Sequence, residues 1–207
     1  MPSPSPTPSP SPTRKPTAAP TKKPVAKTYT FVALGDSLTA WPTDGPWPSR
    51  LDAEDANLRL VNNAGVPGSL TGDMLARLNS DVFAYKPNVL FVMGGTNDLG
   101  QKVGQSTTIA NLRAIIVAAK AKGITVFLMT IPPDSYPGMA TEINSLNAAI
   151  THLGNVYKLT VIDVHAVLST SGGVYVKKFT SDGLHFSDLG AQTVANTVYS
   201  RVHRLGY

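Results

Sequence analysis

Short runs of apolar residues recur along the chain from residue 29 onward, separated by longer stretches with helical spacing of apolar positions. The runs are rich in β-branched and aromatic residues and are bounded by polar residues, glycine or proline, which predicts buried strands. Five strands are expected, at 29–34, 58–62, 89–93, 124–130 and 159–163. Helices are expected between and after them, at 49–57, 71–80, 107–122, 140–153 and 187–205.

Two of these helices carry boundary signals of their own. Gly123 follows the 107–122 pattern and is expected to end that helix, because glycine readily adopts the left-handed conformation of a helix C-terminus. Ser187 precedes the last pattern and is expected to cap it, since a serine oxygen accepts from a free helical N–H. The apolar face of the helix expected at 107–122 comprises Ile109, Leu112, Ile115, Ile116 and Ala119.

Near-continuous hydrophobic strands that alternate with helices predict an α/β fold with a parallel sheet covered on both faces. Right-handed crossovers then give a three-layer α/β/α sandwich built on a five-stranded parallel sheet. In such sheets, sites lie beyond the carboxyl ends of the strands, so the loops that follow strands are where candidate chemistry is sought.

Composition limits the range of functions. A chain of 207 residues with 42% hydrophobic and 15% charged residues suits one globular domain with a sizeable core. There is no cysteine, so a disulfide framework, a thiolate metal site and a cysteine nucleophile are all excluded. No apolar run approaches the roughly 18 residues that a membrane span requires.

The N-terminal segment 1–28 differs from the rest of the chain. It holds nine of the 17 prolines and five of the 18 basic residues, with no acidic residue, which leaves 13 Lys and Arg against 13 Asp and Glu beyond it. We expect a disordered Pro/Ser/Thr-rich basic linker at 1–28 and one domain at 29–207. The high pI therefore belongs to the linker and does not indicate nucleic-acid binding by the fold.

Linkers of this composition commonly tether extracellular enzymes, which favours an extracellular or cell-surface location with attachment to a cell wall or another module. The segment contains no apolar stretch of signal-peptide type, so this expectation depends on the style of the linker alone. The linker could also touch anionic polymers, although a solvated spacer is the simpler interpretation. Nothing in the sequence indicates an oligomeric state.

Two motifs carry the residues of nucleophilic catalysis. Gly35-Asp36-Ser37-Leu38 directly follows the first strand and presents a serine near free helical N–H groups. Asp182-Gly183-Leu184-His185 precedes the last helix and places a carboxylate and an imidazole on one tight turn. A histidine oriented by an aspartate is the base that a serine hydroxyl needs. Taken singly, a cap or phosphate-binding turn explains the first motif, and a capping Asp beside a surface His explains the second.

Two further motifs could supply donors to an oxyanion. Residues 94–98 (GGTND) end the third strand, and Asn97 offers a side-chain amide. Residues 63–68 (NAGVPG) follow the second strand, and a glycine there can present its backbone N–H unobstructed. Ordinary turns explain each motif alone. Together, however, the four motifs supply a nucleophile, a base, an orienting carboxylate and two oxyanion donors on one side of the sheet.

In this order, the four segments resemble the signature blocks of the SGNH (GDSL-type) hydrolase family, and the resemblance covers residues 29–205. It implies the flavodoxin-like SGNH fold and the catalytic residues Ser37, His185 and Asp182. It further implies an oxyanion hole formed by Ser37, Gly68 and Asn97. Gly68 is preferred to Gly65 because its spacing from the Asn of its block matches the family's glycine.

The implied reaction is ester hydrolysis through an acyl-enzyme, with no metal and no cofactor. A carbohydrate (acetyl) esterase or short-chain esterase is favoured by the linker, with a small-molecule or polysaccharide ester as substrate. A lysophospholipase, thioesterase or arylesterase on the same triad is the alternative, and a non-catalytic surface module is a third.

Other prominent residues have competing interpretations. Asp163 and His165 could form a metal or acid-base pair, or serve the structure. Trp41 and Trp47 could line a substrate subsite, or pack their loop. Two groups have a single expectation each: His152 and His203 as surface residues, and Asp36 and Asp98 as side chains that fix loop geometry by hydrogen bonds.

Overall fold

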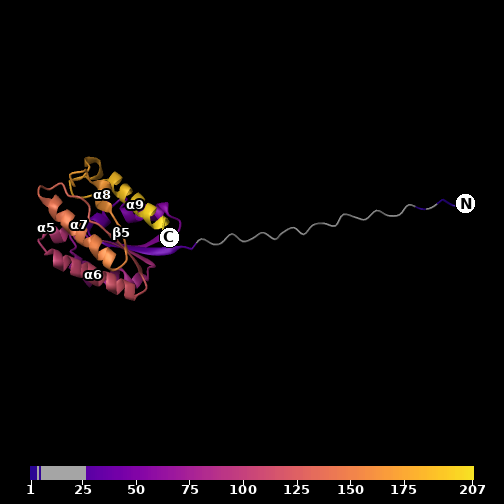
Figure 1. The fold of residues 1–207 in the computed structure, drawn as a ribbon, viewed down its shortest axis with the longest axis horizontal. Helices are drawn as coiled ribbons and strands as arrows, with labels where there is room; N and C mark the ends of the chain where they lie inside the picture. Colours follow the sequence, from indigo (N-terminus) through magenta and orange to yellow (C-terminus); the bar gives the residue numbers. More distant parts are fainter. Residues whose placement is uncertain (4, 6–26) are drawn as a thin grey trace.

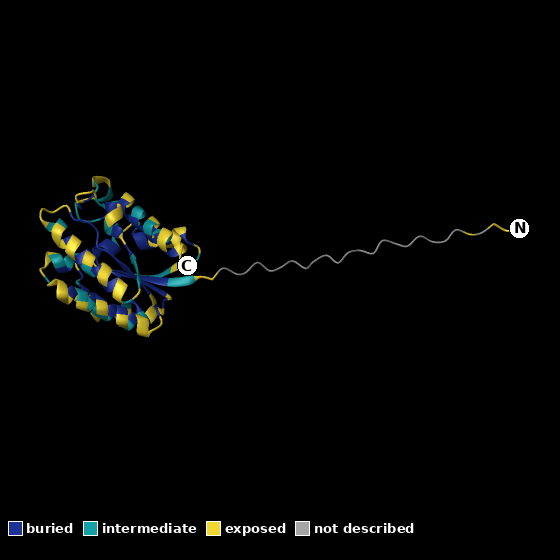
Figure 2. Ribbon diagram, in the orientation of Figure 1, coloured by how far each residue is buried: buried dark blue, intermediate teal, exposed yellow. Residues whose placement is uncertain are grey.

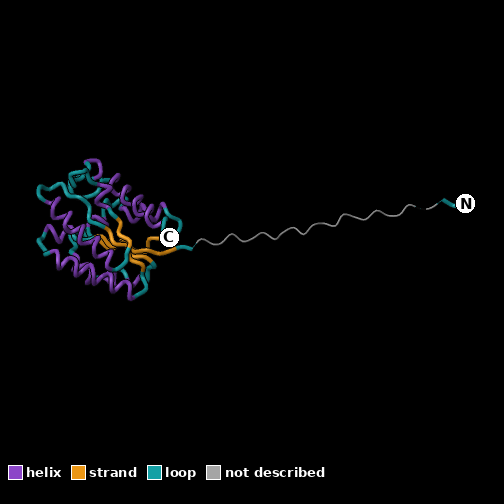
Figure 3. The backbone as a smooth tube through the Cα atoms, viewed as in Figure 1, coloured by secondary structure: helices purple, strands orange, loops and turns teal. Residues whose placement is uncertain are grey.

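The computed structural model describes residues 1–3, 5 and 27–207. Most of the linker predicted at 1–28 lies outside the described residues, so that assignment stays a prediction. All strand pairs are parallel, in the order β2-β1-β3-β4-β5 (Figures 1 and 3). The strands are β1 Tyr29–Gly35, β2 Leu58–Gly65, β3 Val89–Met93, β4 Thr125–Met129 and β5 Thr160–Ile162.

Helices cover both faces of this sheet, as the sequence predicts. One face packs against α2 Trp47–Glu54, α8 Val164–Leu168 and α9 Asp188–His203. The other packs against α3 Thr71–Ala76, α4 Leu78–Asp81, α6 Gln105–Ala121 and α7 Met139–Val156. In Figure 1, α9 and α6 lie on opposite sides of the layer that contains β5. Two short helices follow strand ends, α1 Ser37–Ala40 and α5 Thr96–Gly100, and two 3₁₀ turns are η1 Phe83–Tyr85 and η2 Lys177–Phe179.

The inner strands β1, β3 and β4 are largely buried on both faces, which explains their continuous apolar sequences, whereas the edge strands β2 and β5 are only partly buried. Along β1, Phe31 and Ala33 point into the cluster under α9, whereas Val32 and Leu34 point into the cluster under α6. Figure 2 shows the middle of the sheet in dark blue and yellow on the outer faces of the helices. No helix in the described part combines the length and apolar character needed to cross a membrane.

The topology marks β1 as the switch point of the sheet. The chain moves from β1 to one neighbour, β2, and then crosses back to the other neighbour, β3. The connections at the carboxyl end of β1 therefore diverge, which is where open α/β sheets form their crevice.

Several boundaries differ from the predicted ones. The helix expected at 71–80 is two helices, α3 and α4, with Arg77 between them at φ −99°, ψ 12°. The helix expected from residue 49 begins at Trp47, because Pro48 fits the first turn of a helix. The two boundary predictions are confirmed, since Gly123 has φ +74° and Ser187 accepts a hydrogen bond from the Gly190 N–H at 3.1 Å.

Candidate active site

Ser37 occupies a sharp turn between β1 and α1. The Asp36 side chain caps α1 by accepting from the Leu38 N–H at 2.9 Å, and Ser37 is the first helical residue, 7% exposed. The turn is tight: a Cβ at Gly35 would lie 2.0 Å from Thr39 Oγ1, and one at Gly65 would lie 2.5 Å from the Ala40 N. Two side-chain-free positions therefore let α1 pack directly onto the strand ends.

His185 and Asp182 lie in the loop between η2 and α9, and this loop reaches Ser37 across the chain. The distance between His185 Nε2 and Ser37 Oγ is 3.1 Å, and the distance between His185 Nδ1 and Asp182 Oδ2 is 2.7 Å. The structure thus brings the three residues expected from the two motifs into one hydrogen-bonded chain. Such a chain can move a proton from the hydroxyl to the imidazole.

The carboxylate of Asp182 is held in its ionised form. Its Oδ1 accepts from the Leu184 N–H at 2.9 Å and from the His185 N–H at 2.7 Å. Partial burial would raise the pKa of Asp182, but the hydrogen bonds from the His185 side chain and backbone and from Leu184 outweigh it and lower the pKa to about 2. A permanent negative charge therefore faces the imidazole at neutral pH.

A buried phenol holds this loop from below. Tyr175 is 5% exposed, and its hydroxyl donates to the Leu184 carbonyl at 3.0 Å. Burial and the nearby carboxylates, Asp134 and Asp182 foremost, raise the pKa of Tyr175 well above its usual value, so it remains a donor. Sequence analysis missed Tyr175, because a tyrosine in a Gly- and Ser-rich stretch carries no signal of its own.

The loop that follows β2 offers two glycines with different environments. The Gly65 N–H donates to the Asn63 side chain at 3.1 Å and is therefore already used. Gly68 lies exposed in a turn at φ +79°, and no hydrogen bond from its N–H occurs among residues 27–207. The geometry therefore favours Gly68 as the free donor of the two.

Asn97 lies in the first turn of α5, just beyond β3. One N–H of its amide donates to the Ser69 carbonyl at 3.1 Å, which ties α5 to the loop after β2. Asp98 strengthens the link by accepting from the Thr71 N–H at 2.9 Å. The carbonyl of Gly35 accepts from Arg77 at 2.7 Å, so the same loop region is also fixed to β1. Arg77 is a second residue that sequence analysis did not single out.

A cavity of about 800 Å³ opens beside the imidazole. Its lining includes Trp41, Asp44, Asp182, His185 and Asp188. The Trp41 and His185 rings meet edge to face, with centroids 4.6 Å apart. Trp41 therefore lies at the site.

Trp47, in contrast, packs inside the protein and does not line the site. It is 1% exposed and packs in the core against Phe91, with ring centroids 5.9 Å apart. It therefore contributes to packing and has no contact with the cavity beside His185.

The remaining titratable residues near the strand ends serve the structure. Asp163 caps α8 by accepting from the Ala166 N–H at 3.0 Å, and it accepts from Thr130 at 3.1 Å. No group of three or more His, Cys, Asp or Glu with metal-binding placement occurs in the part of the chain that the structure describes. Burial raises the pKa of Asp36 to about 7, against the hydrogen bond from Leu38 and the nearby His185. Asp36 and Asp98 both make the loop-fixing hydrogen bonds expected of them.

A three-layer α/β/α fold that joins a serine, a histidine and an aspartate at the end of its first strand defines the class of protein. The chain belongs to the GDSL-like lipase/acylhydrolase family, whose sequence profile matches residues 33–193. Membership supports the expectation of a carboxylic ester hydrolase.

Two curated relatives resemble part of the chain. The uncharacterized lipoprotein YqeF of Bacillus subtilis is 35% identical over 49% of this chain and 48% of its own length. An arylesterase of Vibrio mimicus is 33% identical over 50% of this chain and 56% of its own length. The chain therefore spans about half the length of the curated relatives it matches.

Solved structures share the fold over most of the chain. A Desulfitobacterium hafniense protein assigned to the lipolytic G-D-S-L family has a TM-score of 0.77 and 24% identity, covering 84% of this chain and 99% of that one. An acetylxylan esterase from Geobacillus stearothermophilus has a TM-score of 0.71 and 21% identity, covering 86% and 95%. At these identities the likeness concerns the fold.

Proposed function

We propose that this protein is a serine esterase that hydrolyses carboxylic esters through an acyl-enzyme. The observation that carries the proposal is the chain of contacts from Ser37 Oγ to His185 Nε2 at 3.1 Å and from His185 Nδ1 to Asp182 Oδ2 at 2.7 Å. His185 accepts the Ser37 proton as Oγ attacks the ester carbonyl, and then donates it to the leaving alcohol. Asp182 stabilises the imidazolium that forms. Water repeats the sequence and releases the acid.

The oxyanion of each tetrahedral intermediate is held by three donors in this proposal: the backbone N–H groups of Ser37 and Gly68 and the side-chain amide of Asn97. Ser37 begins a helix, so its N–H has no partner within that helix. The free N–H of Gly68 and the second N–H of the Asn97 amide support the same assignment. One such donor typically contributes about 3–4 kcal/mol of transition-state stabilisation.

The substrate we propose is a short-chain, in particular acetyl, ester of a carbohydrate. The cavity beside His185 receives the leaving alcohol, because His185 is the group that protonates it. Trp41 supplies an aromatic surface there, and Asp44 and Asp188 supply carboxylates that accept hydrogen bonds from sugar hydroxyls. The negative charge of Asp44 disfavours the phosphate of a lysophospholipid, whereas Asp188 is paired with Arg50 at 3.1 Å. The fold likeness to an acetylxylan esterase agrees with this choice. The arylesterase relative supports the alternative, an arylesterase on the same triad.

We also propose that residues 29–207 act as a hydrolase domain at the cell surface, with residues 1–28 as its tether. The Pro/Ser/Thr-rich composition of that segment supports this, and so does the lipoprotein relative. Detection of the protein in a cell-surface fraction tests the location.

The catalytic proposal is tested with wild-type protein, Ser37→Ala and the matched control Ser106→Ala, whose serine lies exposed on α6. All three are offered p-nitrophenyl acetate, acetylated xylan and a long-chain lysophospholipid. We expect the control to match wild type and Ser37→Ala to lose nearly all turnover. Equal turnover by wild type and Ser37→Ala would identify a non-catalytic module, and fatty-acid release without acetate release would identify a lipid-directed enzyme.

A further inference from the structure

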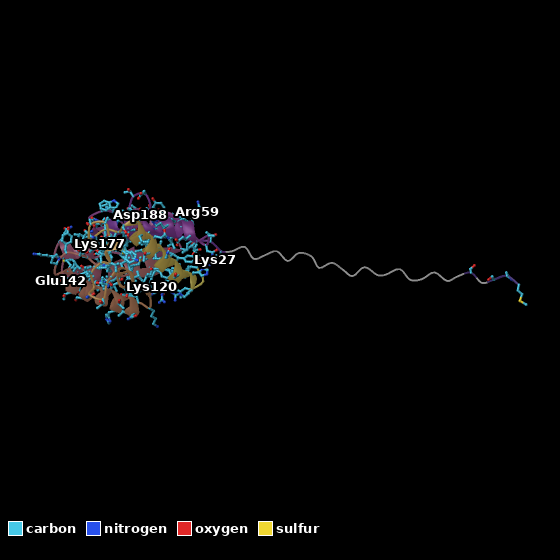
Figure 4. All side chains as sticks on the ribbon, turned by 90° about the horizontal axis from the view of Figure 1, so that it is seen from above. Lys27, Arg59, Lys120, Glu142, Lys177 and Asp188 are labelled. Carbon is cyan, nitrogen blue, oxygen red and sulfur yellow. The ribbon has the colours of Figure 1, made fainter. Side chains whose placement is uncertain are left out.

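Lysines occupy the turns that lead into four adjacent strands. Lys27 precedes β1, Lys86 precedes β3, Lys122 precedes β4 and Lys158 precedes β5. Parallel strands begin at the same edge of a sheet, so all four lysines lie at the edge opposite Ser37 and His185. In Figure 4, Lys27 and Lys120 lie toward one end of the fold and Glu142 toward the other.

Two cavities open at this edge. One, of about 590 Å³, is lined by Lys27, Lys86 and Lys122. The other, of about 550 Å³, is lined by Lys120 and Lys158. Both are also lined by residues 123–125 and by Tyr207, so they adjoin. The five lysines with these two cavities form what we call the basal groove.

No ion pair among the described residues neutralises the charge of the basal groove. The described residues contain ion pairs at Arg50, Arg77 and His185, and none that involves a lysine of the groove. Residues 1–28 contain no acidic side chain and cannot supply a partner. The positive charges therefore remain available to a ligand.

Aromatic rings, rather than carboxylates, position these ammonium groups. Lys27 Nζ lies 4.6 Å from the centre of the Tyr29 ring, and Lys122 Nζ lies 5.6 Å from that of Phe83. Such contacts hold a cation in place and leave its charge uncompensated. Lys120 Nζ also donates to the Tyr157 carbonyl at 3.0 Å.

Two of the groove lysines hold a conformation that glycine adopts more easily. Lys86 has φ +48° and Lys158 has φ +53°, both in the left-handed region. A lysine in each turn accepts this strain where a glycine would relieve it. Lys102, outside the groove, has the same conformation after α5, so this backbone is a feature of the helix ends and not of the groove.

Carboxylates gather at the opposite edge. Asp98 follows β3, Asp163 follows β5, and Asp182 contacts His185. A polyanion is therefore attracted to the basal groove and repelled from the catalytic edge.

We propose that the basal groove binds a linear phosphodiester polymer and so holds the catalytic edge outward. The concave shape favours a single flexible chain over a flat lipid surface, which cannot enter the two cavities. Bases of single-stranded nucleic acid require open aromatic faces for stacking. The Tyr29 ring is instead covered by Lys27 and packs against Tyr207, with ring centroids 4.9 Å apart. A polymer without aromatic groups, such as poly(glycerol phosphate), fits these constraints.

The test uses the full chain and fluorescently labelled poly(glycerol phosphate), with binding followed by anisotropy at low and physiological salt. The groove variant is Lys86→Gln/Lys122→Gln. Its matched control is Lys102→Gln/Lys178→Gln, because Lys102 is also left-handed at φ +58° and Lys178 also lies over a ring, that of Phe179, at 4.9 Å. We expect the groove variant to bind about 10- to 30-fold more weakly, and physiological salt to weaken wild-type binding. The control should bind like wild type.

Turnover of p-nitrophenyl acetate by every variant reports that the fold is intact. A third variant, Arg14→Gln/Lys15→Gln/Lys22→Gln/Lys23→Gln, separates the groove from the N-terminal segment. The proposal is overturned if the groove variant binds as tightly as wild type, or if only the third variant loses binding. Preferential binding to phosphatidylglycerol vesicles or to single-stranded DNA over the polymer would overturn it as well.

Discussion

The indole ring of Trp41 meets the imidazole of His185 edge to face, at a centroid distance of 4.6 Å and an interplanar angle of 62°. Trp41 directly follows α1, and its backbone N–H donates to the backbone carbonyl of Ser37 at 2.9 Å. One residue is therefore tied to the backbone of the nucleophile and packed against the ring of the base. Loss of the indole ring removes the contact with the imidazole, while the backbone bond to Ser37 remains.

Trp41→Ala is expected to lower kcat for p-nitrophenyl acetate about fivefold, because an aromatic pair contributes roughly 1 kcal/mol to holding the imidazole. It should also raise KM for acetylated xylan through loss of the cavity wall. Trp41→Phe keeps a ring and should restore most of kcat. Steady-state kinetics on both substrates measure the effect, and an unchanged kcat in the alanine variant would contradict the positioning role.

Asp182→Asn is expected to lower kcat by about 10⁴-fold while leaving the fold intact. The asparagine amide would donate to Nδ1 of His185, which leaves Nε2 protonated and unable to accept from Ser37. Glu142→Gln is the control, since Glu142 lies exposed on α7 and does not line the cavity beside His185. Activity of Asp182→Asn near that of the control would show that the carboxylate is not needed.

Asn97→Ala is expected to lose roughly 100- to 1000-fold in kcat through loss of an oxyanion donor. Asn63→Ala serves as a control, because its amide also bridges loops at the site by donating to the Thr39 carbonyl at 3.1 Å. The control should lower the melting temperature with only a small effect on kcat. Equal kinetic losses in both variants would assign Asn97 to loop structure alone.

Tyr175→Phe removes the hydroxyl that donates to the Leu184 carbonyl. We expect a loss of about 1 kcal/mol in the free energy of unfolding, and a several-fold drop in kcat as the catalytic loop loosens. The exposed Tyr136 offers a comparison, and Tyr136→Phe should change neither quantity. Denaturant melts and kinetics decide; a stable variant with reduced KM alone would argue against this role.

Asp36→Asn tests the raised pKa of about 7 at Asp36. A carboxyl group whose folded pKa exceeds its unfolded value binds more protons in the native state, so stability falls as pH rises from about 4 to 7. Asparagine keeps an oxygen for the Leu38 N–H and does not titrate. The variant should lack this pH-dependent loss, which amounts to at most about 4 kcal/mol. Parallel pH–stability curves for the two proteins would contradict the shift.

The strands and long helices were predictable because the spacing of their apolar residues matches the side of each element that is buried. The run at 89–93 is apolar at every position and forms β3, which is buried throughout. The helix expected at 107–122 is α6, displaced by two residues at its start and one at its end. In these segments, local pattern and tertiary environment agree.

The short elements at the site could not be predicted in the same way. A four-residue helix such as α1 has too few positions to show a period, and its existence depends on Gly35 and Gly65 allowing close packing. The break between α3 and α4 has no glycine or proline to announce it. At that break, Arg77 donates to the carbonyls of Gly35 and Ala64, partners that only the folded chain brings near.

The convergence of Ser37, His185 and Asp182 was predictable from motifs, whereas the contacts of Tyr175 and Arg77 were not. The first three have reactive side chains in recognisable order along the chain. The other two act through single carbonyl contacts whose partners are defined by tertiary structure. The opposition of the basal lysines to the catalytic carboxylates likewise became visible only once the strand order was known.

The facing pair Gly35 and Gly65 limits how this enzyme can diversify. The two glycines are paired in register on neighbouring strands, and both contact α1. A side chain at either position would clash with α1 and displace Ser37, the first residue of that helix. Mutational libraries that seek new acyl or alcohol preferences should therefore recover these two codons unchanged, while the exposed cavity residues Thr43 and Asp44 vary. Variation is thus confined to residues at the rim of the crevice, and the packing of α1 against Gly35 and Gly65 stays fixed.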